Sequence, residues 1–151
     1  MPLDTSIWSI DEWLNLVLKL SLSLLVGALI GLNRQSEKKP AGLRTHMLVT
    51  LGATIFVMVS LQSSQGKVSP DALSRVIQGI TAGVGFLGAG EILRQSDIEK
   101  NQVKVRGLTS AAAIWVSSAL GVAIGAGLYP LALVSVLMTW ITLSLIKKLE
   151  R

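Results

Sequence analysis

The feature that most constrains this chain is a stretch of 40 residues, between Arg106 and Lys147, that contains no Asp, Glu, Lys or Arg. A helix needs about 20 mostly apolar residues to cross the hydrocarbon core of a bilayer, so this stretch can hold two membrane-spanning helices. The segment Gly125-Ala126-Gly127-Leu128-Tyr129-Pro130 has residues typical of a tight turn between them, and Pro130 is suited to the first turn of the second helix.

Three more stretches without charged residues predict further helices. They contain 22 residues between Arg44 and Lys67, 15 between Arg75 and Glu91, and 14 between Lys19 and Arg34. We therefore predict one transmembrane domain covering residues 1–151, an all-α integral membrane bundle of five helices. The expected helices cover residues 13–32, 44–62, 72–93, 107–127 and 130–147.

Composition excludes other classes of protein. Of the 151 residues 50% are apolar and 15% charged, whereas soluble domains have about 25% charged residues. A single soluble core of this length cannot enclose so much apolar surface. The absence of cysteine excludes disulfides and thiolate sites. With one histidine and no phosphate-binding loop, the chain is expected not to be an enzyme and to need no cofactor.

Basic residues predict the orientation in the membrane, because cytoplasmic loops are rich in Lys and Arg. Eleven of them fall in three connections expected on one side, and only Lys67 is a clear basic residue on the other. The eleven are Arg34, Lys38, Lys39, Arg44, Arg94, Lys100, Lys104, Arg106, Lys147, Lys148 and Arg151. The N-terminus is therefore expected outside and the C-terminus in the cytoplasm. The first basic residue is Lys19, so we expect no removable signal peptide. Bases confined to short membrane-surface loops also argue against a nucleic-acid partner.

Small residues spaced four apart are expected to let the helices approach closely, as they do in bilayers. The candidates for helix packing are Gly27, Gly31, Gly79, Gly83, Gly85, Gly88, Gly90, Ser117, Gly121 and Gly125. Residues 79–90 have a second interpretation, a locally unwound helix that binds an ion, since broken helices mark transporter sites. The first and third expected helices also end in similar Gly-rich runs, at 27–34 and 88–94, and the helix after each begins with Gly-Leu, which suggests a parallel repeat of two hairpins with the fifth helix appended.

Four polar residues within the predicted helices are candidates for a polar or ion site: Lys19, Arg75, Gln78 and Glu91. A cation within a spanning helix costs about 2.5 to 3.5 kcal/mol on insertion scales. Lys19 extends to the membrane surface, is paired structurally within the bundle, or lines a polar cavity. Glu91 either pairs with Arg94 at the interface or binds a proton or cation.

Four runs of residues carry a resemblance to a known family. They are GALIGLNRQ at 27–35, PAGLRTHMLVTLGA at 40–53, GVGFLGAGEILR at 83–94 and GLTSAAAIWVSSALGVAIGAG at 107–127. In this order and spacing they resemble the MgtC/SapB family of bacterial inner-membrane proteins. The chain departs from the family at Asn33-Arg34-Gln35, where Glu-Arg-Glu is common, and at Glu91, where an aliphatic residue is usual.

The resemblance implies a multi-pass inner-membrane protein linked to growth in low magnesium and, in pathogens, to survival inside host cells. It implies a short form without the soluble C-terminal domain of longer members. The family's motif corner falls on Arg34, Gly42, Arg44, Thr45 and His46. We expect His46 to cap the helix or contact head groups rather than bind a metal, because a lone histidine makes a poor metal site.

Two functions remain open at this level. The first is a modulator of magnesium or proton economy that contacts a larger complex, with the F-type ATP synthase implied by the family, or a second copy of itself. The second is a small oligomeric channel or transporter for magnesium or protons that uses the four polar candidates. In either case the partners expected are the lipid bilayer and a homo-oligomer.

Overall fold

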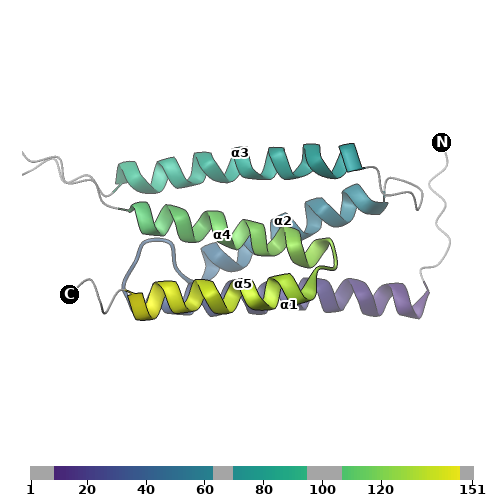
Figure 1. The fold of residues 1–151 in the computed structure, drawn as a ribbon, viewed down its shortest axis with the longest axis horizontal. Helices are drawn as coiled ribbons and strands as arrows, with labels where there is room; N and C mark the ends of the chain where they lie inside the picture. The colour runs from purple at the N-terminus through teal and green to yellow at the C-terminus, as the bar shows by residue number, and fades with distance from the viewer. Residues whose placement is uncertain (1–8, 63–69, 95–106, 147–151) are drawn as a thin grey trace, which may run out of the picture.

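In the computed structural model the described residues are 9–62, 70–94 and 107–146, and they form an all-helical bundle (Figure 1). The helices are α1 (Ile10–Ser36), α2 (Leu43–Gln62), α3 (Pro70–Arg94), α4 (Leu108–Gly125) and α5 (Tyr129–Ile141), which continues into the π-helical segment η2 (Thr142–Ile146). Four are long and apolar enough to cross a membrane, and the fifth apolar helix, Tyr129–Leu145, is shorter. The prediction of an all-α protein with five helices is confirmed.

Helix α1 is longer than the 13–32 expected from hydropathy, because both of its ends are held by polar caps that hydropathy does not register. Ser9 and Glu12 form a capping box: the Ser9 Oγ accepts from the Glu12 backbone N–H at 3.2 Å, and the Ser9 N–H donates to the Glu12 carboxylate at 2.8 Å. This pairing satisfies free N–H groups of the first turn. At the other end Ser36 Oγ donates to the Asn33 carbonyl.

The turn predicted between the last two helices is present at residues 126–128. The Leu128 N–H donates to the Ala123 carbonyl and the Gly127 N–H to the Ile124 carbonyl, the two bonds of a Schellman motif. Gly127 has φ +78°, a conformation that glycine adopts without steric cost. Pro130 follows in the first turn of α5.

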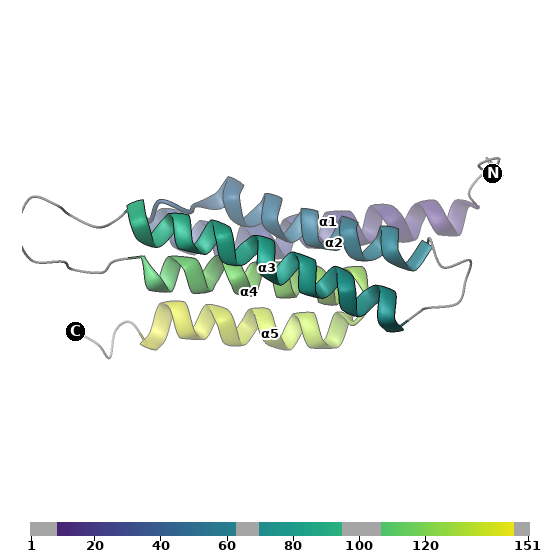
Figure 2. The ribbon, with the colours of Figure 1, turned by 90° about the horizontal axis from the view of Figure 1, so that it is seen from above.

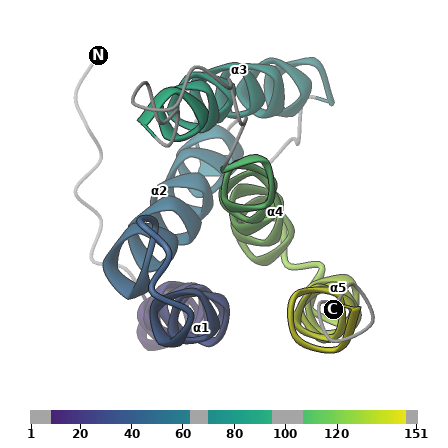
Figure 3. The same ribbon diagram turned by 90° about the vertical axis from the view of Figure 1, so that its left-hand side faces the viewer.

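Helix α4 lies at the centre, in contact with each of the other four α-helices. One apolar cluster joins it to α1 and α5, including Ile30, Leu120 and Val136, and a second joins it to α2 and α3, including Val57 and Ile114. Figure 2 shows the helices running alternately in opposite directions, and Figure 3 shows α3 at the edge of the bundle, far from α1 and α5. The basic residues 100–106 and 147–151, Lys67 and the Arg94 side chain lie outside what is described.

Candidate functional site

The buried face shared by α1, α2 and α4 carries a row of polar side chains, which we call the polar seam. It consists of Arg34, Ser110, His46, Ser117, Thr50 and Thr54. Each of these side chains is at most 2% exposed. Buried polar groups in a membrane domain are costly unless they are paired, so the partners of each one define what the seam does.

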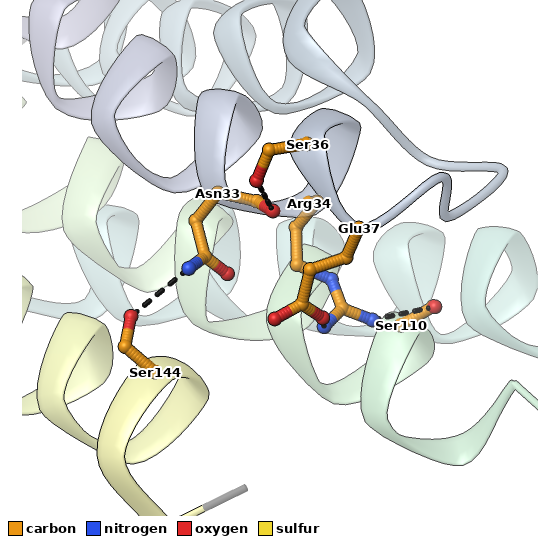
Figure 4. Close-up of polar contacts among 6 residues, drawn as sticks. All are labelled: Asn33, Arg34, Ser36, Glu37, Ser110 and Ser144. Carbon is orange, nitrogen blue, oxygen red and sulfur yellow. Dashed lines mark hydrogen bonds and ion pairs between the residues drawn. The ribbon is translucent and has the colours of Figure 1, made fainter. Parts of the chain in front are cut away.

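Arg34 forms the end of the seam near the last turn of α1 (Figure 4). Its Nη2 donates to Ser110 Oγ at 2.8 Å, and its Nη1 lies 3.5 Å from Glu37 Oε2. The buried Glu91 carboxylate also acts electrostatically on this guanidinium. Arg34 thereby joins the end of α1 to the first turn of α4, and the charge of Glu91, near the end of α3, also acts on it.

Asn33 extends this cluster towards the C-terminal helix. Its Nδ2 donates to Ser144 Oγ at 2.9 Å, as Figure 4 shows, which ties α1 to η2. Two neighbouring residues of α1 therefore bind two different helices, Arg34 on α4 and Asn33 on η2. The departure from Glu-Arg-Glu at this place supplies the amide that makes the second bond.

His46 is buried in the first turn of α2, where sequence reasoning expected a cap or a head-group contact. Its Nδ1 lies 2.8 Å from Ser117 Oγ, which in turn lies 2.9 Å from the Ala113 carbonyl. The ring is buried because the chain at His46 packs directly against Gly27 of α1, whose missing side chain leaves the room.

Thr50 and Thr54 continue the seam along α2. Thr50 Oγ1 donates to the His46 carbonyl, and Thr54 Oγ1 lies within reach of two carbonyls, Thr50 at 3.0 Å and Gly121 of α4 at 2.9 Å. The contact with Gly121 crosses between helices, where polar bonds hold membrane helices together. Sequence reasoning missed these residues, although His46, Thr50 and Thr54 recur every four positions on one side of α2.

Lys19 lies beyond the far end of the seam, partly buried on α1. Its Nζ donates to the Gly125 carbonyl at 2.9 Å, in the last turn of α4. A cation at the C-terminus of a helix is favoured by the free carbonyls and the helix dipole. The structure therefore places the Lys19 ammonium against the end of α4, the structural pairing that was one of the alternatives considered from the sequence.

The four polar candidates are not brought together. Arg75 and Gln78 are exposed on α3, Glu91 is buried at the other end of the same helix, and Lys19 lies on the end of α4. Within the described ranges no group of three or more His, Cys, Asp or Glu residues could hold a metal ion. Of the motif corner, Arg34 and His46 are in the seam, Gly42 and Thr45 are half-buried beside it, and Arg44 is exposed.

The packing candidates fall into two groups. A Cβ placed at Gly27 would lie 2.7 Å from the His46 carbonyl oxygen, and one at Gly31 would lie 2.6 Å from the Leu43 Cα. Gly121 and Gly125 face the α2 backbone as closely, Gly88 meets Ala111, and Ser117 is in the seam. In contrast, a Cβ at any of four α3 glycines would find nothing within 4 Å; these are Gly79, Gly83, Gly85 and Gly90. Residues 79–90 are helical throughout.

Comparisons with known proteins agree on one family. The MgtC family model matches residues 20–151. Protein SrpB of Synechococcus elongatus is 49% identical over 144 residues, which cover 93% of this chain and 79% of SrpB. No solved structure is significantly similar.

Two further relatives are longer than this chain. Protein MgtC of Salmonella typhimurium is 40% identical over 122 residues, 81% of this chain and 48% of MgtC. YhiD of Escherichia coli, named a putative magnesium transporter, is 38% identical over 137 residues, 88% of this chain and 61% of YhiD. The chain therefore spans about half the length of MgtC and about three fifths of YhiD.

Proposed function

Since this chain belongs to the MgtC family, we propose that it is a multi-pass protein of the bacterial inner membrane that serves magnesium homeostasis and growth at low magnesium. The similarity to MgtC and to YhiD, named a putative magnesium transporter, supports the link to magnesium. The matched part of MgtC is 48% of that protein, so the proposal concerns only what this membrane domain does.

In this proposal the chain is a modulator that acts through helix contacts with a larger membrane complex or with itself. The observation that carries it is the use of the polar seam: Arg34, His46 and Thr54 each contact a group on α4. Side chains bonded in this way hold the helices together. The F-type ATP synthase, implied by the family resemblance, is the candidate complex; no enzymatic activity, cofactor or nucleic acid belongs to the proposal.

A transporter or channel for magnesium or protons is the second candidate. Ionisable residues buried in a membrane domain mark ion pathways by default, and both Arg34 and Glu91 are buried. The printed name of YhiD points the same way. The two functions differ at Glu91. A transporter requires the charge of its carboxyl group to change during activity, and a modulator does not.

The proposed topology places the N-terminus outside and the C-terminus in the cytoplasm. The start of α1 and the end of η2 lie at opposite ends of the bundle (Figure 1), as an odd number of crossings requires. A parallel repeat of α1–α2 and α3–α4 remains part of the proposal. Each hairpin has a glycine of its first helix against its second, Gly31 against Leu43 and Gly88 against Ala111.

Two measurements test the function. A deletion strain carrying this chain should grow at limiting magnesium where the empty strain does not, and lack of rescue would overturn the proposal. Sealed vesicles containing only the purified chain should show no flux of magnesium or protons if it is a modulator. Flux that is lost in Glu91→Gln, but kept in the matched control Asp71→Asn at the exposed start of α3, would establish the transporter instead.

A further inference from the structure

The outward side of α3 is built unlike the outward sides of α1 and α5. Helix α1 exposes Leu14, Leu25 and Leu29, and α5 exposes Leu133, Leu137 and Met138, which are the large apolar side chains that suit contact with lipid. On α3 the only large apolar side chains exposed among the described residues are Phe86 and Leu87. The remainder of this side is small or polar.

We call this side the α3 face and define it by Arg75, Gln78, Gly79, Ala82, Gly83 and Ala89, all of them exposed. At 100° per residue these six positions lie within one arc of the helix. Small residues at four-residue spacing are those that let two membrane helices approach closely, and they give lipid tails little surface to pack on. Among the described residues nothing covers the two glycines of this face, since a Cβ at Gly79 or Gly83 would meet none of their atoms within 4 Å.

Gln78 makes lipid an unsuitable cover for this face. It lies eight residues after Pro70, about 12 Å along the helix, well inside a segment that is long and apolar enough to cross a membrane. Its side chain has no hydrogen-bond partner among the described residues. The hydrogen bond that Thr81 Oγ1 donates to Gln78 goes to the backbone carbonyl. A primary amide in hydrocarbon without a partner is unfavourable, and a second polar side chain at the same depth removes that cost.

An apolar groove between α2 and α3 adjoins the face. It has a volume of about 670 Å³, and its lining includes Gly52 and Phe56 of α2 as well as Gly79 and Gly83. The two glycines therefore belong both to the α3 face and to the groove. Phe86, 81% exposed, projects from the same helix, and Leu87, 51% exposed, lines the groove.

We propose that the α3 face is the interface with a second copy of this chain, in which the two α3 helices lie parallel about a two-fold axis along the membrane normal. Such an interface is self-complementary, so equal depths meet. The two Gln78 amides then face each other and hydrogen-bond across the axis. Phe86 of each chain reaches the open groove beside Gly83 of the partner.

Charge complementarity selects a second copy as the occupant. Asp71 and Arg75 are exposed one turn apart on the same side of α3. In the two-fold arrangement the two Arg75 lie at one depth and the two Asp71 lie one turn away, so each Arg75 side chain reaches along the helix to the partner's Asp71 and two symmetric ion pairs form. A lipid acyl chain in the groove would leave Gln78 without a partner, and an unrelated apolar helix would leave both Gln78 and Arg75 without one.

This inference deepens the proposed function and rests on it for the role of the dimer in the cell. The test of the dimer does not depend on magnesium. The chain has no cysteine, so a disulfide formed by one introduced cysteine reports on that position alone. Ala82→Cys, oxidised in native membranes with copper phenanthroline, should give a disulfide-linked dimer of the chain. The matched control Leu25→Cys, an exposed position on α1, should give at least about fivefold less dimer, as expected for a preference near 1 kcal/mol.

Variants of the same cysteine chain test the contacts. Gly83→Leu fills the groove without disturbing the single chain and should lower the Ala82→Cys dimer yield. Arg75→Asp should lower it by placing four carboxylates together, and adding Asp71→Arg should restore it. Equal dimer yields at residues 82 and 25, cross-links to a different protein, or a yield unchanged by Gly83→Leu would each overturn the inference. Dimers without rescue at low magnesium would count against the proposed function alone.

Discussion

Gly121 on α4 and Gly83 on α3 are glycines in similar small-residue stripes, yet their surroundings differ completely. A Cβ at Gly121 would overlap the Thr50 carbonyl of α2, whereas one at Gly83 would meet nothing within 4 Å. Polar residues show the same division: Thr54 reaches across to α4, and Gln78 faces outward. The same sequence pattern therefore marks both the closed interfaces between helices and a face that stays open within the described residues.

The largest effect is expected from Arg34→Met. Removing the guanidinium breaks its buried hydrogen bond to Ser110 and its ion pair with Glu37. Breaking a buried charge pair by removing one partner costs about 3 to 5 kcal/mol, and we expect that loss in the free energy of unfolding. Unfolding of the purified protein in mixed micelles of increasing SDS fraction, followed by tryptophan fluorescence, measures it. A loss below about 1 kcal/mol would mean that Arg34 is not held as the structure shows.

Gly121→Leu tests the closed side of the comparison. The new side chain must displace backbone of α2, and overpacking of this kind typically costs up to about 3 kcal/mol. The matched control is Gly85→Leu on α3, where space is open, so the free energy of unfolding should barely change. Equal losses at the two positions would remove the distinction between the two regions.

Thr54→Val removes one hydroxyl and keeps the shape of the side chain. The lost bond to the Gly121 carbonyl crosses between α2 and α4, and such bonds in membrane proteins average about 0.6 kcal/mol with a maximum near 1.7. Thr81→Val on α3 is the control, because Thr81 Oγ1 bonds only to carbonyls of its own helix. The same unfolding assay should show a smaller loss for Thr81→Val.

The smallest effect, and one of opposite sign, is expected for Gly52→Ala. No atom lies within 4 Å of the added methyl group, and alanine is favoured over glycine inside a helix by about 0.5 to 1 kcal/mol. The free energy of unfolding should rise. Gly27→Ala should lower it instead, since that methyl group would lie 2.7 Å from the His46 carbonyl oxygen. A fall for Gly52→Ala would show that its space is already filled.

Several parts of the fold could be predicted from local sequence. The stretches without charge locate all five helices, and Gly127 with Pro130 identifies the turn before α5, because helix stops and starts depend on residues close in the chain. The extension of α1 back to Ile10 could also be predicted from the sequence, since Ser9 and Glu12 have the spacing of a capping box. Hydropathy alone missed it because both residues are polar.

The candidate site was less predictable. Lys19 was recognisable as a costly residue, but its partner is a carbonyl 106 positions away, on the end of α4. His46 gave no sign of burial next to Arg44 and Thr45, because burial there depends on α1 and α4 closing around it. The contact of Arg34 with Ser110 is likewise between residues distant in the chain.

By itself the sequence determined the class of protein, the positions of the helices and the set of small residues available for close packing. These follow from composition and short-range spacing, because the bilayer rewards long apolar helices wherever they occur. Only the tertiary structure decided which glycines face backbone and which stay open, and which polar side chains pair across helices. That choice depends on how each helix is rotated about its axis, and rotation is set by all of its neighbours together.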